Sequence, residues 1–159
     1  MSSIHKNLSI FSTNNLPDIS QKRFAIVVAE WNEEVTEALA QRAKKTLLEY
    51  GATEENIVRV NVPGSYELTF AAQKMAQKVD IDAVICIGCV IQGETKHNDY
   101  INNSVAQGLT AVSLKYDKPV IFGILTPNTE QQAIDRAGGI HGNKGDEAAI
   151  TAVKMLTIW

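Results

Sequence analysis

The fold of this chain is decided by one stretch, Ile85-Cys86-Ile87-Gly88-Cys89-Val90-Ile91-Gln92-Gly93-Glu94-Thr95-Lys96-His97. Its first half is apolar and partly β-branched, which is the pattern of a strand buried on both faces of a parallel sheet. The run breaks at Gln92-Gly93 into a polar segment, and a helical pattern resumes from about Asn98. Backbone N–H groups are exposed where such a helix begins, and the helix dipole favours negative charge there. The stretch therefore predicts a buried strand, a short loop and a helix, with an anion site between them.

His97 is the candidate for acid–base chemistry at this site. An unperturbed histidine pKa of about 6.5 suits proton transfer near neutral pH. On this stretch alone, a plain turn at Gly93 and a surface histidine explain the residues equally well. The rest of the chain has to decide between the two interpretations.

Length and composition are those of a single soluble domain. The 159 residues suffice for one compact core, and 45% apolar with 21% charged residues is an ordinary globular composition. The net charge is −3 and no basic block occurs, so nothing points to nucleic acid or to an anionic membrane surface. No apolar run approaches the roughly 18 residues of a membrane span, and no secretion signal is recognisable. We therefore expect a cytoplasmic protein without a membrane or nucleic-acid partner.

The two cysteines, Cys86 and Cys89, form a C-x-x-C spacing inside the predicted strand. Redox and zinc sites with this spacing lie on turns or helix starts, where both sulfur atoms can converge. Residues three apart in a strand point to opposite faces of the sheet. We therefore expect two small buried hydrophobic residues and no metal site.

Strand and helix patterns alternate along the chain after a polar, flexible arm at residues 1–22, in which Leu8-Ser9-Ile10 could add a short strand. Buried strands are predicted at residues 24–29, 57–62, 83–91 and 120–125. Helices are predicted from a cap at Asn32 to Gly51, along an apolar stripe from Leu68 to Val79, from about Asn98 to Lys115, from a capping box at Thr129 to Gly138-Gly139, and from about Asp146. This order predicts one α/β domain over residues 23–159, a three-layer α/β/α sandwich around a flavodoxin-like, four-stranded parallel sheet.

In a parallel sheet, ligands bind outside the carboxyl ends of the strands. Trp31-Asn32 follows the first predicted strand, residues 63–67 follow the second, and residues 92–97 follow the third. An aromatic side chain, a glycine–hydroxyl pair and a histidine thus converge on one edge. This combination suits a flat heterocycle stacked on Trp31 and a phosphate held at residues 93–95.

Two other uses of this architecture fit the residues poorly. A flavodoxin-type FMN site needs a hydroxyl-rich phosphate loop after the first strand, whereas Glu30-Trp31-Asn32-Glu33-Glu34 is acidic and repels phosphate. A phosphoacceptor receiver needs an aspartate at the carboxyl end of the third strand, whereas Asp80 and Asp82 lie at its start.

Five segments carry a family resemblance. They are Trp31-Asn32, Val62-Pro63-Gly64-Ser65-Tyr66-Glu67, the stretch from Gly88 to His97, residues 119–126, and Arg136-Ala137-Gly138 with Gly142-Asn143-Lys144-Gly145. In this order and spacing, over about residues 23 to 157, they resemble the lumazine synthase family, which acts in riboflavin biosynthesis. The Gly-Glu-Thr-x-His segment with the later Gly-Asn-Lys-Gly is highly specific.

The resemblance implies an enzyme, a 6,7-dimethyl-8-ribityllumazine synthase. Such an enzyme condenses 5-amino-6-(D-ribitylamino)uracil with 3,4-dihydroxy-2-butanone 4-phosphate, without a metal or organic cofactor, and releases phosphate and water. It is a homo-oligomer built from pentamers with active sites between subunits, and an association with a riboflavin synthase is left open. The loop at residues 138–145 has the short form, which favours an icosahedral shell of sixty subunits over a pentamer or decamer.

The resemblance also assigns site residues, with His97 as the proton-transfer residue. The residues that match pyrimidine- and ribityl-binding positions are Trp31, Asn32, Gly64, Ser65, Tyr66, Glu67, Val90, Ile91, Gln92, Phe122 and Lys144. Those that match phosphate-binding positions are Gly93, Glu94, Thr95 and Arg136. Phe122 and Arg136 match parts supplied by a neighbouring subunit.

Several positions depart from the family pattern. Trp31 and Ser65-Tyr66 stand where phenylalanine and Ala-Phe are usual, Asn98 where an aromatic is common, and Ile140 where a lysine is frequent. None of these changes removes the base or the phosphate clamp. The alternative function is a non-catalytic member of the same fold that binds lumazine or flavin, or that only builds a shell. Loss of His97 or Arg136 would favour that alternative, and both are present.

Overall fold

The structure is a computed structural model that describes residues 17–158 of the chain. Its strands are β1 (Phe24–Ala29), β2 (Ile57–Val62), β3 (Ala83–Cys89), β4 (Val120–Leu125), β5 (Ala137–Gly139) and β6 (Gly142–Asn143). Its helices are α1 (Glu33–Glu49), α2 (Leu68–Ala76), α3 (His97–Tyr116), α4 (Glu130–Ile134) and α5 (Lys144–Met155), with short 3₁₀ turns η3 (Glu54–Asn56) and η4 (Ser65–Glu67). The predicted strand at Leu8-Ser9-Ile10 lies outside the described residues.

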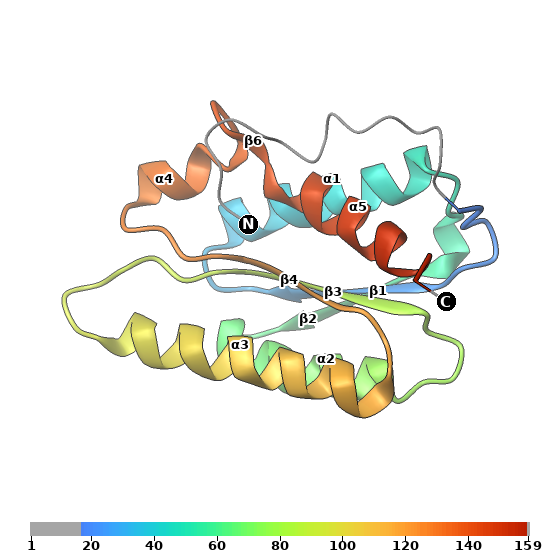
Figure 1. Cartoon of the computed structure of the whole chain (residues 1–159). Helices are drawn as coiled ribbons and strands as arrows, with labels where there is room; N and C mark the ends of the chain where they lie inside the picture. The colour runs from blue at the N-terminus through green and yellow to red at the C-terminus, as the bar shows by residue number, and fades with distance from the viewer. Residues whose placement is uncertain (1–16, 159) are drawn as a thin grey trace.

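The main sheet has the strand order β2-β1-β3-β4, and all of its strands are parallel. Every residue of β1 and β3, the two central strands, is buried, whereas β2 and β4 at the edges are partly exposed. Helices α1 and α5 cover one face of the sheet, and α2 and α3 cover the other (Figure 1). The predicted three-layer sandwich with a flavodoxin-like parallel sheet is confirmed.

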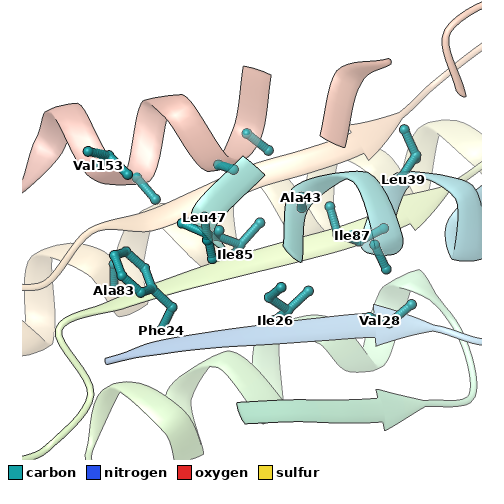
Figure 2. Packing of buried hydrophobic residues seen from close by; sticks show 14 of the residues in the cluster. Phe24, Ile26, Val28, Leu39, Ala43, Leu47, Ala83, Ile85, Ile87 and Val153 are labelled. Atoms are coloured by element: carbon teal, nitrogen blue, oxygen red, sulfur yellow. The ribbon is translucent and has the colours of Figure 1, made fainter. Parts of the chain in front are cut away.

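Side chains of the central strands alternate between two separate hydrophobic cores. Figure 2 shows the core beneath α1 and α5, in which Phe24, Ile26 and Val28 of β1 lie beside Ile85 and Ile87 of β3. The core beneath α2 and α3 takes the intervening residues of the same strands. Both cores form because side chains in a strand point alternately to opposite faces.

The two cysteines follow this alternation. Cys86 is buried in the core beneath α2 and α3, and Cys89 is buried in the core beneath α1 and α5. Both are free thiols. The prediction of two small buried residues on opposite faces is confirmed.

Several predicted boundaries were wrong. Strand β3 ends at Cys89 and not at Ile91, although the chain stays extended and the Val90 N–H donates to the Leu125 carbonyl at 2.8 Å. The apolar stripe of α2 does not reach Val79, which is 98% exposed, because the helix ends at Ala76. The antiparallel β5–β6 hairpin was not predicted, since two very short strands have no readable sequence pattern.

The short helix α4 begins as predicted and ends earlier. Thr129 Oγ1 accepts a hydrogen bond from the Gln132 N–H at 3.2 Å, which confirms one half of the predicted capping box. The other half does not form, because Gln132 Oε1 accepts from the N–H of Asn128 at 2.9 Å and not from that of Thr129. The helix ends at Ile134, and the expected terminus at Gly138-Gly139 lies in β5 instead.

Residues 17–22, which the sequence assigns to the arm, lie against the domain. Ile19 is fully buried in the core beneath α1 and α5, and Lys22 Nζ is 3.2 Å from Asp82 Oδ1. The role of the preceding residues stays a prediction.

Helices α1 and α5 meet at Gly145, where the backbones approach too closely for any side chain. A Cβ atom at Gly145 would lie 2.0 Å from the carbonyl oxygen of Leu39. The neighbouring Asn143 completes the contact, because its Nδ2 donates to the carbonyls of Ala38 at 3.2 Å and Ala137 at 3.0 Å. This junction attaches the β5–β6 hairpin to the body of the domain.

The junction makes Gly145 a sensitive position. We expect Gly145→Ala to lower the free energy of unfolding by about 2–3 kcal/mol, because the added methyl group must displace a helix backbone rather than a flexible side chain. Chemical denaturation measures this loss. Gly93→Ala is the matched control, since a Cβ at Gly93 has nothing within 4 Å. Equal stabilities of the two variants would contradict the close approach.

Candidate active site

A cavity of about 810 Å³ opens at the carboxyl ends of β1, β2 and β3. Four segments line it: Trp31 and Asn32 after β1, residues 63–67 after β2, residues 89–91 at the end of β3, and Gly93, Thr95, His97, Asn98, Tyr100 and Ile101 around the start of α3. The volume lies within the range of about 300–1,000 Å³ that is usual for small-molecule sites. The cavity is at the edge of the sheet where the sequence predicts ligand binding.

Most of the predicted site residues meet at this cavity. Those that line it are Trp31, Asn32, Gly64, Ser65, Tyr66, Glu67, Val90, Ile91, Gly93, Thr95 and His97. Gln92 and Glu94 belong to the same exposed loop without lining the cavity. Phe122, Arg136 and Lys144 are elsewhere in the chain.

Asn32 holds two sides of the cavity together. Its backbone has the left-handed conformation, with φ 60° and ψ 47°, which asparagine tolerates better than most residues. The expected side-chain cap of α1 does not form, because Asn32 Nδ2 donates to the carbonyl of Cys89 at 2.8 Å instead. This bond links the turn after β1 to the end of β3, and beside it Trp31 is left 74% exposed at the cavity.

The turn η4 forms another wall. Ser65 is buried, and a Cβ atom at Gly88 of β3 would lie 2.6 Å from Ser65 Oγ, so η4 packs directly on the strand. Glu67 lines the cavity, and within residues 17–158 its carboxylate has no hydrogen-bond or ion-pair partner. Together with Tyr66, this wall presents hydroxyl and carboxylate groups that suit a polyol.

The loop before α3 presents a row of free backbone donors. Within the described part of the chain, the N–H groups of residues 93–96 and of Asn98 have no acceptor. The His97 N–H is only weakly engaged, at 3.4 Å from Thr95 Oγ1. Free N–H groups at the start of a helix, here one of 20 residues, can bind an anion. The predicted phosphate loop thus has unpaired backbone donors, and its role in phosphate binding stays a prediction.

The cavity of a single chain lacks a cation to pair with a phosphate. No lysine or arginine of residues 17–158 lines it; its lining includes one carboxylate, Glu67, and one imidazole, His97. Arg136 and Lys144 lie together at the base of the β5–β6 hairpin, where the Lys144 N–H donates to the Arg136 carbonyl at 2.9 Å. Arg136 Nη1 donates to the Gln132 carbonyl at 2.9 Å, and Lys144 Nζ pairs with Glu147. These two cations belong to a separate part of the surface of the chain.

Comparison with known proteins identifies the family. The sequence model of 6,7-dimethyl-8-ribityllumazine synthase matches residues 21–159. A 6,7-dimethyl-8-ribityllumazine synthase of Cytophaga hutchinsonii is 60% identical over 156 residues, which cover 98% of this chain and 98% of that protein. The chain belongs to the lumazine synthase family. A second relative of the same description, from Parabacteroides distasonis, is 52% identical with the same coverage.

Membership of the lumazine synthase family confirms the resemblance and the predicted enzyme of riboflavin biosynthesis. None of the helices in residues 17–158 is long and apolar enough to cross a membrane. In the same part of the chain, no group of three or more His, Cys, Asp or Glu side chains could hold a metal ion.

Five cavity-lining residues were not among the predicted site residues: Pro63, Cys89, Asn98, Tyr100 and Ile101. Tyr100 and Ile101 follow His97 by three and four residues, so they lie on the same face of α3 as His97. That spacing was the available signal. Cys89 gave no such signal, because its strand is buried along its whole length.

The thiol of Cys89 borders the cavity but is not a nucleophile. Burial raises the pKa of Cys89 to about 11 and also raises the pKa of Cys86 above its usual range. A thiol is reactive as the thiolate, so both cysteines should be inert at pH 8.

We expect the native protein to release less than about a tenth of its thiols to DTNB within minutes at pH 8, because neither sulfur is ionised or accessible. After unfolding in guanidinium, both cysteines of each chain should react. A Cys89→Ser variant identifies which thiol responds. Rapid reaction of the native protein would contradict the burial of these residues.

Proposed function

We propose that this cavity condenses 5-amino-6-(D-ribitylamino)uracil with 3,4-dihydroxy-2-butanone 4-phosphate to give 6,7-dimethyl-8-ribityllumazine. One observation carries the assignment of the site. The free N–H row at the start of α3, the imidazole of His97 and the exposed ring of Trp31 all border one cavity of about 810 Å³. A phosphate site, a proton carrier and a stacking surface are what the two substrates require.

The pyrimidine substrate suits the part of the cavity between Trp31 and η4. The exposed indole provides a flat surface for the heterocycle, with Val90 and Ile91 along the ring edge. The unpaired Glu67 carboxylate is positioned to accept hydrogen bonds from ribityl hydroxyls. Asn32 links the turn that carries Trp31 to the end of β3 through its bond to Cys89.

The phosphorylated ketone suits the loop at residues 93–96, where backbone donors can hold its phosphate. The substrate amine then attacks the ketone carbonyl, and a first water leaves to give an imine. Phosphate is eliminated, the second amine attacks the remaining carbonyl, and a second water leaves as the ring closes. Each step moves a proton, and His97 is the titratable side chain at the phosphate end of the cavity. Proximity of two bound substrates can contribute up to about 7–11 kcal/mol, and acid–base help about 10²–10⁴-fold.

Replacement of His97 tests this role. We expect His97→Ala to lower kcat by about 10- to 10³-fold with a smaller effect on KM, because the substrate amine supplies the nucleophile and the imidazole only moves protons. The assay follows lumazine absorbance after both substrates are mixed with the protein, and circular dichroism verifies that the variant is folded. Equal activity of the variant and the parent from pH 6 to 8 would remove His97 from the mechanism.

We infer further that a complete site forms between two subunits. Within residues 17–158, the cavity of one chain has no lysine or arginine, and the hairpin of a neighbouring chain could supply both. Phe122, on the edge strand β4, is 42% exposed and could also contact a neighbour. Each chain would supply its cavity to one neighbour and its Phe122, Arg136 and Lys144 to another. Such head-to-tail contacts close into rings, and we propose a ring of five.

The short loop between α4 and α5 supports assembly of twelve rings into a shell. Light scattering decides between the assemblies, since a shell of sixty subunits of 17.4 kDa has a mass of about 1 MDa. An association of the shell with a riboflavin synthase stays a prediction.

A shared site predicts complementation between two inactive variants. We expect His97→Ala and Arg136→Ala to be weak individually, because one damages the cavity and the other damages the half that a neighbour supplies. Random co-assembly in equal amounts should restore up to about a quarter of the parent activity, since one site in four combines two intact halves. Simple mixing of the preassembled variants is the control. No recovery on co-assembly would place both residues in the same site of one chain.

A further inference from the structure

One polar side chain of the cavity has no role in the proposed function. Asn98 lies in the first turn of α3, lines the cavity and is half-buried. Its side-chain amide makes one hydrogen bond, which is a long one of 3.4 Å from Nδ2 to Oδ1 of the exposed Asp99. The donor capacity of this amide is therefore almost unused.

The geometry of the helix determines the direction in which the Asn98 side chain points. The Cα–Cβ bonds of an α-helix tilt toward its N-terminus, so the side chain of Asn98 leans over the preceding turn and loop. That loop, at residues 93–96, carries the free N–H groups described above. The start of α3 follows this loop at the carboxyl edge of the sheet (Figure 1). An anion held by the loop would therefore lie within reach of the amide.

The charges around the loop favour a neutral donor at this position. Glu94 and Asp99 flank it, and within the described part of the chain neither carboxylate has an ion-pair partner. Lys96, the cation of the loop itself, is exposed and does not line the cavity. Residues 17–158 of one chain contribute no lysine or arginine to the lining, so N–H donors are what this chain itself offers to an incoming phosphate. An amide adds a donor without another negative charge.

We propose that Asn98 is a substrate-binding residue whose Nδ2 donates a hydrogen bond to the phosphate of the ketone substrate. This assignment rests on the proposed function. It makes the first turn of α3 part of the phosphate site, through a side chain as well as through the backbone.

Kinetics of two variants of similar size test the proposal. Asn98→Asp replaces the donor by a negative acceptor, and Asn98→Leu removes all polarity. We expect the KM for the ketone phosphate to rise tenfold or more in Asn98→Asp and threefold or more in Asn98→Leu, whereas the KM for the pyrimidine stays within twofold. The inhibition constant of inorganic phosphate should rise in parallel.

Asn103→Asp is the matched control, because Asn103 is exposed on the same helix and does not line the cavity. It should change neither KM. Loss of folding does not explain the expected effect, since an acidic side chain in the first turn of a helix interacts favourably with the dipole. Thermal melting of Asn98→Asp should therefore match that of the parent.

Unchanged KM values for the ketone phosphate in both Asn98 variants would overturn the proposal, as would an increase confined to the pyrimidine. In either case lumazine formation by the parent would still support the proposed function. If the parent forms no lumazine, the proposed function fails. Calorimetry with inorganic phosphate then decides the role of Asn98, since equal affinities of parent and Asn98→Asp would overturn it and a tenfold loss would support it.

Discussion

Burial of β1 and β3 on both faces is the constraint on which the rest of the structure depends. Both faces of the two central strands are apolar, so helices must cover the sheet on both sides to keep these side chains from water. Because the strands are parallel, each connection must also cross over one face of the sheet. All four strands then end at the same edge. The segments that leave them, around Trp31, Tyr66, Val90 and His97, are brought together by this geometry although they are far apart in sequence.

At the carboxyl edge of the sheet, a polar side chain bonds to a distant strand instead of capping the helix that it precedes. The side chain of Asn32 does not cap α1, and its backbone is left-handed. Its Nδ2 donates to the carbonyl of Cys89 in β3 instead. A hydrogen bond between elements 57 residues apart stabilises the opening of the cavity more directly than a cap within one helix. Large aromatic side chains remain exposed around this opening, with Trp31 at 74% and Tyr100 at 75%. Exposed aromatic rings that border a cavity indicate contact with a ligand or a neighbouring chain.

Charge is divided between two parts of the surface. The proposed anion site of the cavity consists of backbone N–H groups, whereas Arg136 and Lys144 are held at the hairpin by the Gln132 carbonyl and the Glu147 carboxylate. Because Gly145 lets α5 approach α1 closely, the hairpin is anchored to the domain and its cations have defined positions. This arrangement explains why one chain provides an anion site and a cation site that do not meet within the chain.

The sequence by itself determined the four parallel strands, the opposite directions of Cys86 and Cys89, the strand, loop and helix around residues 89–97, and the family. All of these follow from local periodicity or from motifs, and local sequence carries that information. Only the tertiary structure decided what depends on contacts between distant segments: the bond from Asn32 to Cys89, the early end of α2 that exposes Val79, the β5–β6 hairpin, and the separation of Lys144 from the cavity. The physical reason is that hydrogen-bond partners and close backbone approaches, such as Gly145 against Leu39, are chosen by packing in three dimensions and leave no periodic trace in the sequence.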